Sequence, residues 1–158
     1  MDSRHLLELL ADNPVIAAVK DDQGLESALA GSVDVIFLLY GNILNLSELV
    51  DRVRAAGIIS TRSPLVKRGR ELGLVAVQRF FLLDSMALEN IEKDLARDAS
   101  DLIEVLPGLM PKMIRRLVQD TGKPVIAGGL ISDKEDVTGA LGAGAVAVST
   151  TNPAVWSM

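Results

Sequence analysis

Seven short apolar runs alternate along the chain with segments of helical periodicity. The intervening segments place apolar residues three and four positions apart, as an amphipathic helix does. The predicted strands are Val15–Val19, Val33–Tyr40, Ile58–Ser60, Leu74–Phe80, Asp101–Leu106, Pro124–Ala127 and Ala145–Val148. This alternation predicts an α/β fold of parallel strands with right-handed crossovers.

The number of strands leaves two architectures open. A TIM (β/α)8-type barrel closes with eight parallel strands, and the pattern supplies seven. An open doubly wound sheet accommodates seven strands without difficulty.

The junction at Gly57 is unusually tight. A predicted helix over Leu49–Ala56 passes into the strand at Ile58 through Gly57 alone, whereas helix-to-strand loops take about 2–6 residues. We therefore hypothesise that one strand–helix unit of a barrel is missing between Gly57 and Ile58, either deleted or omitted. A Cα–Cα distance well beyond ~3.8 Å at this bond would indicate an omitted segment.

Composition bounds the class of protein. The 158 residues are 49% hydrophobic and 23% charged, which predicts a single globular domain over residues 1–158. No apolar run approaches the roughly 20 residues that span a bilayer, so we expect no membrane contact. The chain contains no cysteine, which excludes disulfides and thiol nucleophiles and fits a cytoplasmic protein. The formal net charge of −5 argues mildly against non-specific nucleic-acid binding.

The segment Lys123–Pro153 predicts a phosphate site. Two successive strands end in small residues, and helices are expected to start at Ser132 and Asn152. Backbone N–H groups at such turns can approach an anion closely, and in TIM barrels the loops after strands 7 and 8 do so. The candidate residues are Gly128, Gly129, Ser149 and Thr150. Alternatively, these glycines only end strands, and the small residues only pack helices on the sheet.

Three charged residues stand within or directly after apolar strands. They are Lys20, Arg79 and Glu104. A charge in such a position is costly unless it is paired or faces a polar mouth. Arg79 and Glu104 are therefore candidates to orient a small polyol or, alternatively, to form a buried structural ion pair. Lys20 is placed either to attract a phosphate or to pair with Glu104.

Several stretches together resemble the glycerol-3-phosphate-responsive antiterminators, a family of regulators of glycerol uptake operons. They are PVIAAVK (14–20), VIFLLYGNI (35–43), IISTR (58–62), QRFF (78–81), IEVLPG (103–108), IAGGLI (126–131) and VSTTNP (148–153). The resemblance spans essentially the whole chain. It implies a TIM-type barrel that binds glycerol 3-phosphate, contacts leader mRNA and prevents premature termination of transcription. The family carries a third strand and helix at the tight junction, so third-strand ligand contacts have no counterpart in this sequence.

Basic residues form two clusters that are candidates for RNA contact. They are Arg62, Lys67, Arg68 and Arg70 in one helical segment, and Lys112, Arg115 and Arg116 in another. The alternative is that both are ordinary solvated helix faces. With one Trp, one Tyr and three Phe, base stacking is a poor basis for binding, so phosphate contacts and a steep salt dependence are expected.

Catalytic residues are not evident. The only histidine, His5, lies in the predicted N-terminal helix, and no nucleophile–base pair, metal-ligand cluster or cofactor motif is recognisable. The favoured interpretation is a sensor in which glycerol 3-phosphate shifts the population toward an RNA-competent state or a homo-oligomer. The alternative is a TIM-barrel enzyme, an isomerase or aldolase acting on a triose or sugar phosphate, in which a desolvated Lys20 could form a Schiff base.

Overall fold

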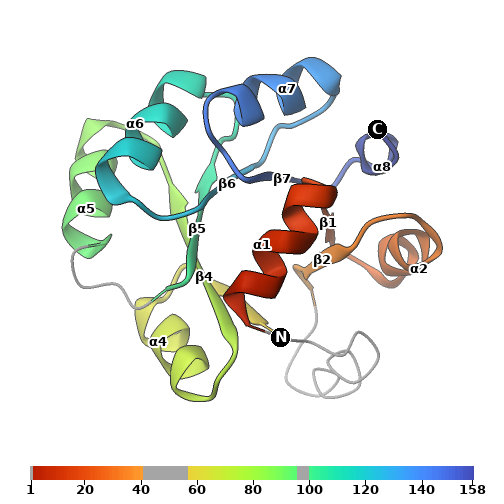
Figure 1. Cartoon of the computed structure of the whole chain (residues 1–158), viewed down its shortest axis with the longest axis horizontal. Coiled ribbons are helices and arrows are strands. Elements are labelled where there is room, and N and C mark those ends of the chain that lie inside the picture. Colours follow the sequence, from red (N-terminus) through yellow and green to blue (C-terminus); the bar gives the residue numbers. More distant parts are fainter. Residues whose placement is uncertain (1, 41–56, 96–99) are drawn as a thin grey trace.

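In the described part of the chain, seven parallel strands form one sheet, and helices surround it (Figure 1). The computed structural model describes residues 2–40, 57–95 and 100–158, so the predicted helix Leu49–Ala56 lies outside the described residues. The strands are β1 (Val15–Val19), β2 (Val35–Leu38), β3 (Gly57–Ser60), β4 (Val75–Phe81), β5 (Leu102–Leu106), β6 (Val125–Gly128) and β7 (Ala147–Thr150). The helices are α1 (Ser3–Asp12), α2 (Asp22–Ala30), α4 (Ser63–Glu71), α5 (Ser85–Leu95), α6 (Pro111–Thr121), α7 (Lys134–Gly142) and α8 (Pro153–Trp156).

The strand order is that of a nearly closed barrel. It runs β2-β1-β7-β6-β5-β4-β3, so the first strand lies beside the last, with Val15 opposite Val148 and Ala17 opposite Thr150. Every neighbouring pair is parallel. This order confirms the α/β barrel of TIM type and disfavours the doubly wound sheet, in which the order reverses at a central strand.

The ring of described strands has one seam, between β2 and β3. These two strands are the ends of the sheet order, and in a complete barrel another strand would separate them. Gly57 and Ile58 are consecutive residues of β3, opposite Val75 and Ala76 of β4. The strand therefore begins at Gly57, one residue before the predicted start, and includes both sides of the tight junction.

Two apolar clusters hold the barrel together. Inside the ring, residues such as Ile16, Leu102 and Ile126 pack with Leu6 and Leu10 of α1, which closes the amino-terminal end of the barrel (Figure 1). Outside the ring, the alternate strand residues pack beneath the other helices. The carboxyl ends of the strands are thereby left as the face where side chains and loops can meet a ligand.

Candidate functional site

The loops after β6 and β7 lie side by side. The hydroxyl of Thr150 donates to the carbonyl of Ile131 at 2.7 Å, and the amide of Asn152 donates to the carbonyl of Ser132 at 3.1 Å. Asn152 also caps α8, because its side chain accepts from the N–H of Ala154. The structure thus brings together the two segments that the sequence predicts as a phosphate cradle.

The ends of these strands differ from the sequence prediction. Gly128 is the last residue of β6, and Ser149 and Thr150 are the last two of β7, where they pair with Ile16 and Ala17 of β1. All three are buried. The positions that follow the two strands and reach the surface are instead Gly129, which is partly exposed, and Thr151, which is exposed.

The start of α7 also shifts by one residue. Asp133, not Ser132, is the N-cap, because its carboxylate accepts from the N–H of Asp136. Asp136 in turn accepts from both the N–H and the hydroxyl of Ser132 at 2.8 Å, and these hydrogen bonds hold the pKa of its carboxyl below the ordinary value. The loop after β6 is therefore anchored at both ends.

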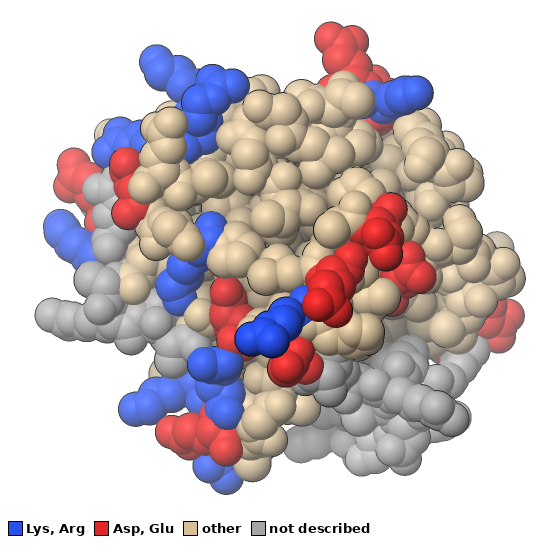
Figure 2. All heavy atoms as spheres, in the orientation of Figure 1, with Lys and Arg blue, Asp and Glu red and all other residues tan. Residues whose placement is uncertain are grey.

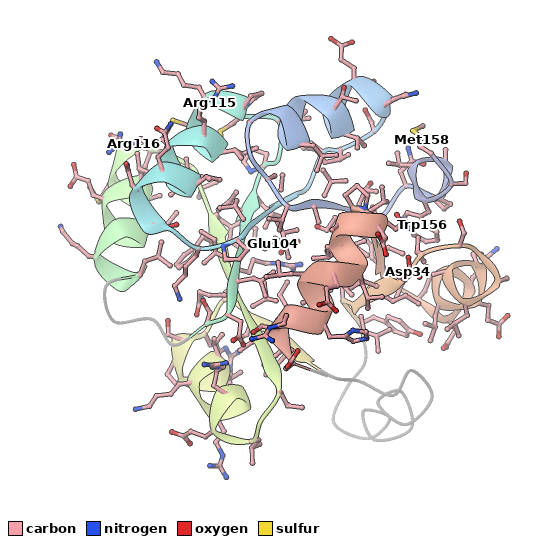
Figure 3. All side chains as sticks on the ribbon, in the orientation of Figure 1. Asp34, Glu104, Arg115, Arg116, Trp156 and Met158 are labelled. Carbon is pink, nitrogen blue, oxygen red and sulfur yellow. The ribbon has the colours of Figure 1, made fainter. Side chains whose placement is uncertain are left out.

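A polar group occupies the interior of the barrel near its carboxyl end. Arg79 and Glu104 stand directly opposite each other on β4 and β5, and their side chains form an ion pair. The other carboxylate oxygen of Glu104 accepts from the hydroxyl of Ser149 at 2.5 Å. Glu104 is fully buried in the centre of the ring (Figure 3), whereas the side chain of Arg79 keeps 17% of its surface.

Gly128 makes room for this group. A Cβ atom built at Gly128 would lie 2.6 Å from a carboxylate oxygen of Glu104 and 2.7 Å from the Ser149 hydroxyl. Such contacts are too close for any side chain, so the glycine accommodates the polar cluster itself. Gly129 has a positive φ of 75°, a conformation in which glycine carries no steric cost.

Lys20 lies on the cradle side of the mouth. It is exposed and lines a pocket of about 280 Å³ with Asp21, Gln23, Thr151 and Pro153. Within the described part of the chain no ion pair joins Lys20 to Glu104, which is paired with Arg79 instead. The pairing of Lys20 with Glu104, one of the two roles that the sequence leaves open, is therefore not formed in the structure.

Arg79 faces a second pocket, of about 350 Å³, at the seam of the barrel. Its lining comes from the end of β2, including Leu38 and Tyr40, and from Ser60 and Thr61 at the end of β3. Arg79 thus contributes to a pocket between the ends of β2 and β3. The structure places this charge and Lys20 on different sides of the mouth.

The two basic clusters lie along one side of the molecule. In Figure 2, Lys and Arg side chains gather over α6 and over α4, while acidic side chains lie across α1. In the first cluster Arg68 pairs with Glu71 and Arg70 pairs with Asp101. Arg62 stands at the N-cap of α4, and Lys67 is exposed on that helix.

The second cluster lies on α6. Arg116 pairs with Asp120, and Lys112 and Arg115 are exposed. Arg115 and Arg116 project outward from α6 (Figure 3). The face of α6 that carries Ile114 and Leu117 is buried against the sheet, so this helix presents a basic face to solvent.

Metal and membrane features are not found in the parts of the chain that the structure covers. Within residues 2–40, 57–95 and 100–158, no three His, Asp or Glu side chains gather as a metal site would require. None of the helices in those ranges has the length and apolar character to cross a bilayer. His5 lies in α1 beside Glu8, at the opposite end of the barrel from the cradle.

Comparison with known proteins identifies relatives along the whole chain. The family described as "Glycerol-3-phosphate responsive antiterminator" matches residues 15–57 and 49–156. The uncharacterized protein YgcP of Escherichia coli K12 is 38% identical over 184 residues, which cover 97% of this chain and 96% of that protein. The alignment exceeds the 158 residues of this chain by 26 positions. The two family matches overlap at residues 49–57, so the match to the family is interrupted at the tight junction before β3.

Two solved structures carry related names. A glycerol uptake operon antiterminator-related protein from Thermotoga maritima has a TM-score of 0.74 and 29% identity, with 91% of this chain and 98% of that chain covered. The glycerol uptake operon antiterminator regulatory protein from Listeria monocytogenes has a TM-score of 0.67 and 27% identity, with 99% and 91% covered. The YdjI aldolase of Escherichia coli (TM-score 0.63, 11% identity, 95% and 80% covered) shows the fold alone.

Proposed function

The chain belongs to the glycerol-3-phosphate responsive antiterminator family, and from this premise we propose that it binds glycerol 3-phosphate at the carboxyl end of the barrel. The observation that carries the proposal is the joining of the loops after β6 and β7 through Thr150 and Asn152. Loops in these positions hold phosphate groups in TIM barrels. No cofactor is needed for this binding.

The phosphate lies, in this proposal, against the backbone N–H groups of Gly129 and Thr151. Both positions come directly after a strand and reach the surface. Lys20 shares a pocket with Thr151 and supplies a positive charge to the dianion. The two loops rest on three buried residues at the ends of β6 and β7. They are Gly128, Ser149 and Thr150.

The glycerol hydroxyls face Arg79. Its side chain is partly exposed, whereas Glu104 is completely buried and can act only by holding Arg79 in place. Glu104 is thus a positioning residue in the proposed site.

We further propose that the liganded protein binds leader mRNA in the cytoplasm and so prevents transcription termination. The exposed basic residues of α6 and α4, led by Lys112 and Arg115, supply contacts to phosphates. The loop before α6 is tied to the cradle, since the N–H of Gly108 donates to the carbonyl of Gly129 at 3.1 Å. Ligand in the cradle can therefore favour one arrangement of the start of α6, which is a population shift.

The enzyme alternative has no specific support in the site. A Schiff-base lysine needs a desolvated amine to be nucleophilic at neutral pH, and Lys20 is exposed. The aldolase likeness concerns the fold, which many unrelated activities share.

Calorimetric titration with glycerol 3-phosphate tests the site. Thr151→Glu adds a like charge at an exposed position, and Gly129→Asp adds charge and bulk, so both should weaken binding at least tenfold. Gly122→Asp is the matched control, because Gly122 has a similar φ of 64° but ends α6 at the far side of the barrel with nothing within 4 Å of its Cβ position. Wild-type affinity in Thr151→Glu would contradict the site.

A further inference from the structure

An apolar surface lies at the carboxyl ends of three neighbouring strands. Among the described residues, nine large apolar side chains are exposed, and five of them lie at or after the carboxyl ends of β4, β5 and β6. They are Phe81, Leu83, Met86, Leu109 and Leu130, and we call them the apolar rim. Leu83 is 81% exposed, Leu130 71% and Met86 69%.

The rim is continuous because the three loops are bonded to one another. Phe81 pairs with Leu106, and the N–H of Leu82 donates to the Leu106 carbonyl at 2.7 Å. The N–H of Gly108 donates to the carbonyl of Gly129, the residue before Leu130. The side chain of Leu106 reaches to within 3.1 Å of the Cβ position of Gly129, which fills the space between the loops.

The rim is large enough to be an interface. Its exposed fractions correspond to roughly 600 Å² of apolar residue surface, at the upper end of what monomers show. A stable interface buries about 800 Å² on each partner, of which about 56–65% is apolar, or roughly 500 Å². The rim therefore supplies the whole apolar portion of one half of a standard interface.

The charges around the apolar rim restrict the class of partner that can bind there. The loops 82–84, 107–110 and 129–133 contain two charged residues, Asp84 and Asp133, and both are acidic. Within these loops no basic side chain is present to pair with a polyanion such as RNA, and Lys112, the second residue of α6, is the next one after the loop 107–110. Leu130 also has a positive φ of 63°, so the backbone holds an apolar side chain in solvent at a conformational cost.

We propose that the apolar rim is the interface of a symmetric dimer of this chain. One copy presents the same surface to the other, so roughly 600 Å² on each side becomes buried around a two-fold axis. The interface lies on the carboxyl face of the barrel. There Leu109 precedes Lys112 of α6 by three residues, and Leu130 directly follows Gly129 of the proposed phosphate site.

Sedimentation equilibrium at micromolar concentrations tests the dimer. The wild-type chain should sediment as a dimer, and Leu83→Lys/Met86→Lys should raise the dimer dissociation constant at least tenfold. The control is Leu72→Lys, since Leu72 is 61% exposed at the other end of the barrel, after α4. Circular dichroism of each variant verifies folding.

Three results would overturn the proposal. They are a wild-type chain that is monomeric at roughly 100 µM, a double variant that dimerises like the wild type, and a Leu72→Lys variant that loses the dimer equally. An unchanged dimer in the glycerol 3-phosphate-binding variant Thr151→Glu is expected, because that residue lies outside the rim.

Discussion

The effects of substitutions at Arg79 and Glu104 on stability should be strongly coupled, because the two side chains form an ion pair. Replacement of Arg79 with Met leaves the carboxylate of Glu104, which has no exposed surface, without its cation. Two unit charges about 4 Å apart at an effective dielectric constant near 20 interact by about 4 kcal/mol. Removal of one partner of a buried pair costs about 3–5 kcal/mol, so Arg79→Met should lower the free energy of unfolding by this amount.

Glu104→Gln should cost less, about 1–2 kcal/mol. The amide still offers an oxygen to the Ser149 hydroxyl, and the Arg79 side chain keeps 17% of its surface, so water can solvate it. The double variant removes both charges and so leaves no unpaired charge in the barrel. The double variant should therefore lose less free energy of unfolding than the two single variants together, by about 2 kcal/mol.

Urea unfolding measures these losses, with Trp156 as the probe. It is the only tryptophan of the chain, and its indole N–H donates to the carbonyl of Thr150 in the buried end of β7. Single losses that add to the double loss within about 0.5 kcal/mol would show that the pair contributes no interaction energy, and the reasoning would fail.

Three further predictions concern the loops and strands of the cradle. Gly128→Ala should destabilise the protein by about 1–3 kcal/mol in thermal melts, because the added Cβ atom would clash with the carboxylate of Glu104. In the same melts, Gly139→Ala on α7 should stabilise the protein by about 0.5–1 kcal/mol, because no atom lies within 4 Å of its Cβ position and alanine favours the helix. The pKa of Asp136 is lowered in the folded state, so the stability that this carboxylate contributes is present above its ordinary pKa of 3.8 and is lost as the pH falls through the lowered value. The difference in Tm between the wild type and Asp136→Asn should therefore shrink on acidification. A difference in Tm that stays constant would contradict this prediction. Leu130→Gly should raise the Tm of the monomer by relieving a positive φ while it weakens the dimer, and a fall in both would refute the assignment of strain.

The sequence predicts the alternation of strands and helices well because hydrophobic periodicity is a local property. Periodicity alone leaves the barrel and the doubly wound sheet open, and the family resemblance implies the barrel. Arg79 and Glu104 could be placed together, since charges inside two consecutive apolar strands meet when parallel strands align. The end of β7 could not be placed, because Ser149 and Thr150 suit either a turn or a strand, and pairing with β1 decides between them. The choice of Asp133 over Ser132 as N-cap likewise depends on the geometry of the loop, since both residue types cap helices well.

The apolar rim has no sequence signal of its own. Leu83, Leu109 and Leu130 lie far apart along the chain, and only the register of β4, β5 and β6 brings their loops together. The exposure of such residues depends on how the barrel closes, and hydrophobic periodicity in the sequence carries no information on that closure.

Binding of leader RNA with and without glycerol 3-phosphate, at two salt concentrations, tests the proposed sensor most directly. We predict that the ligand increases RNA affinity, that Thr151→Glu abolishes this increase, and that affinity falls steeply with salt because phosphate contacts dominate. RNA affinity that is the same with and without the ligand, or chemical conversion of the ligand, would contradict the account.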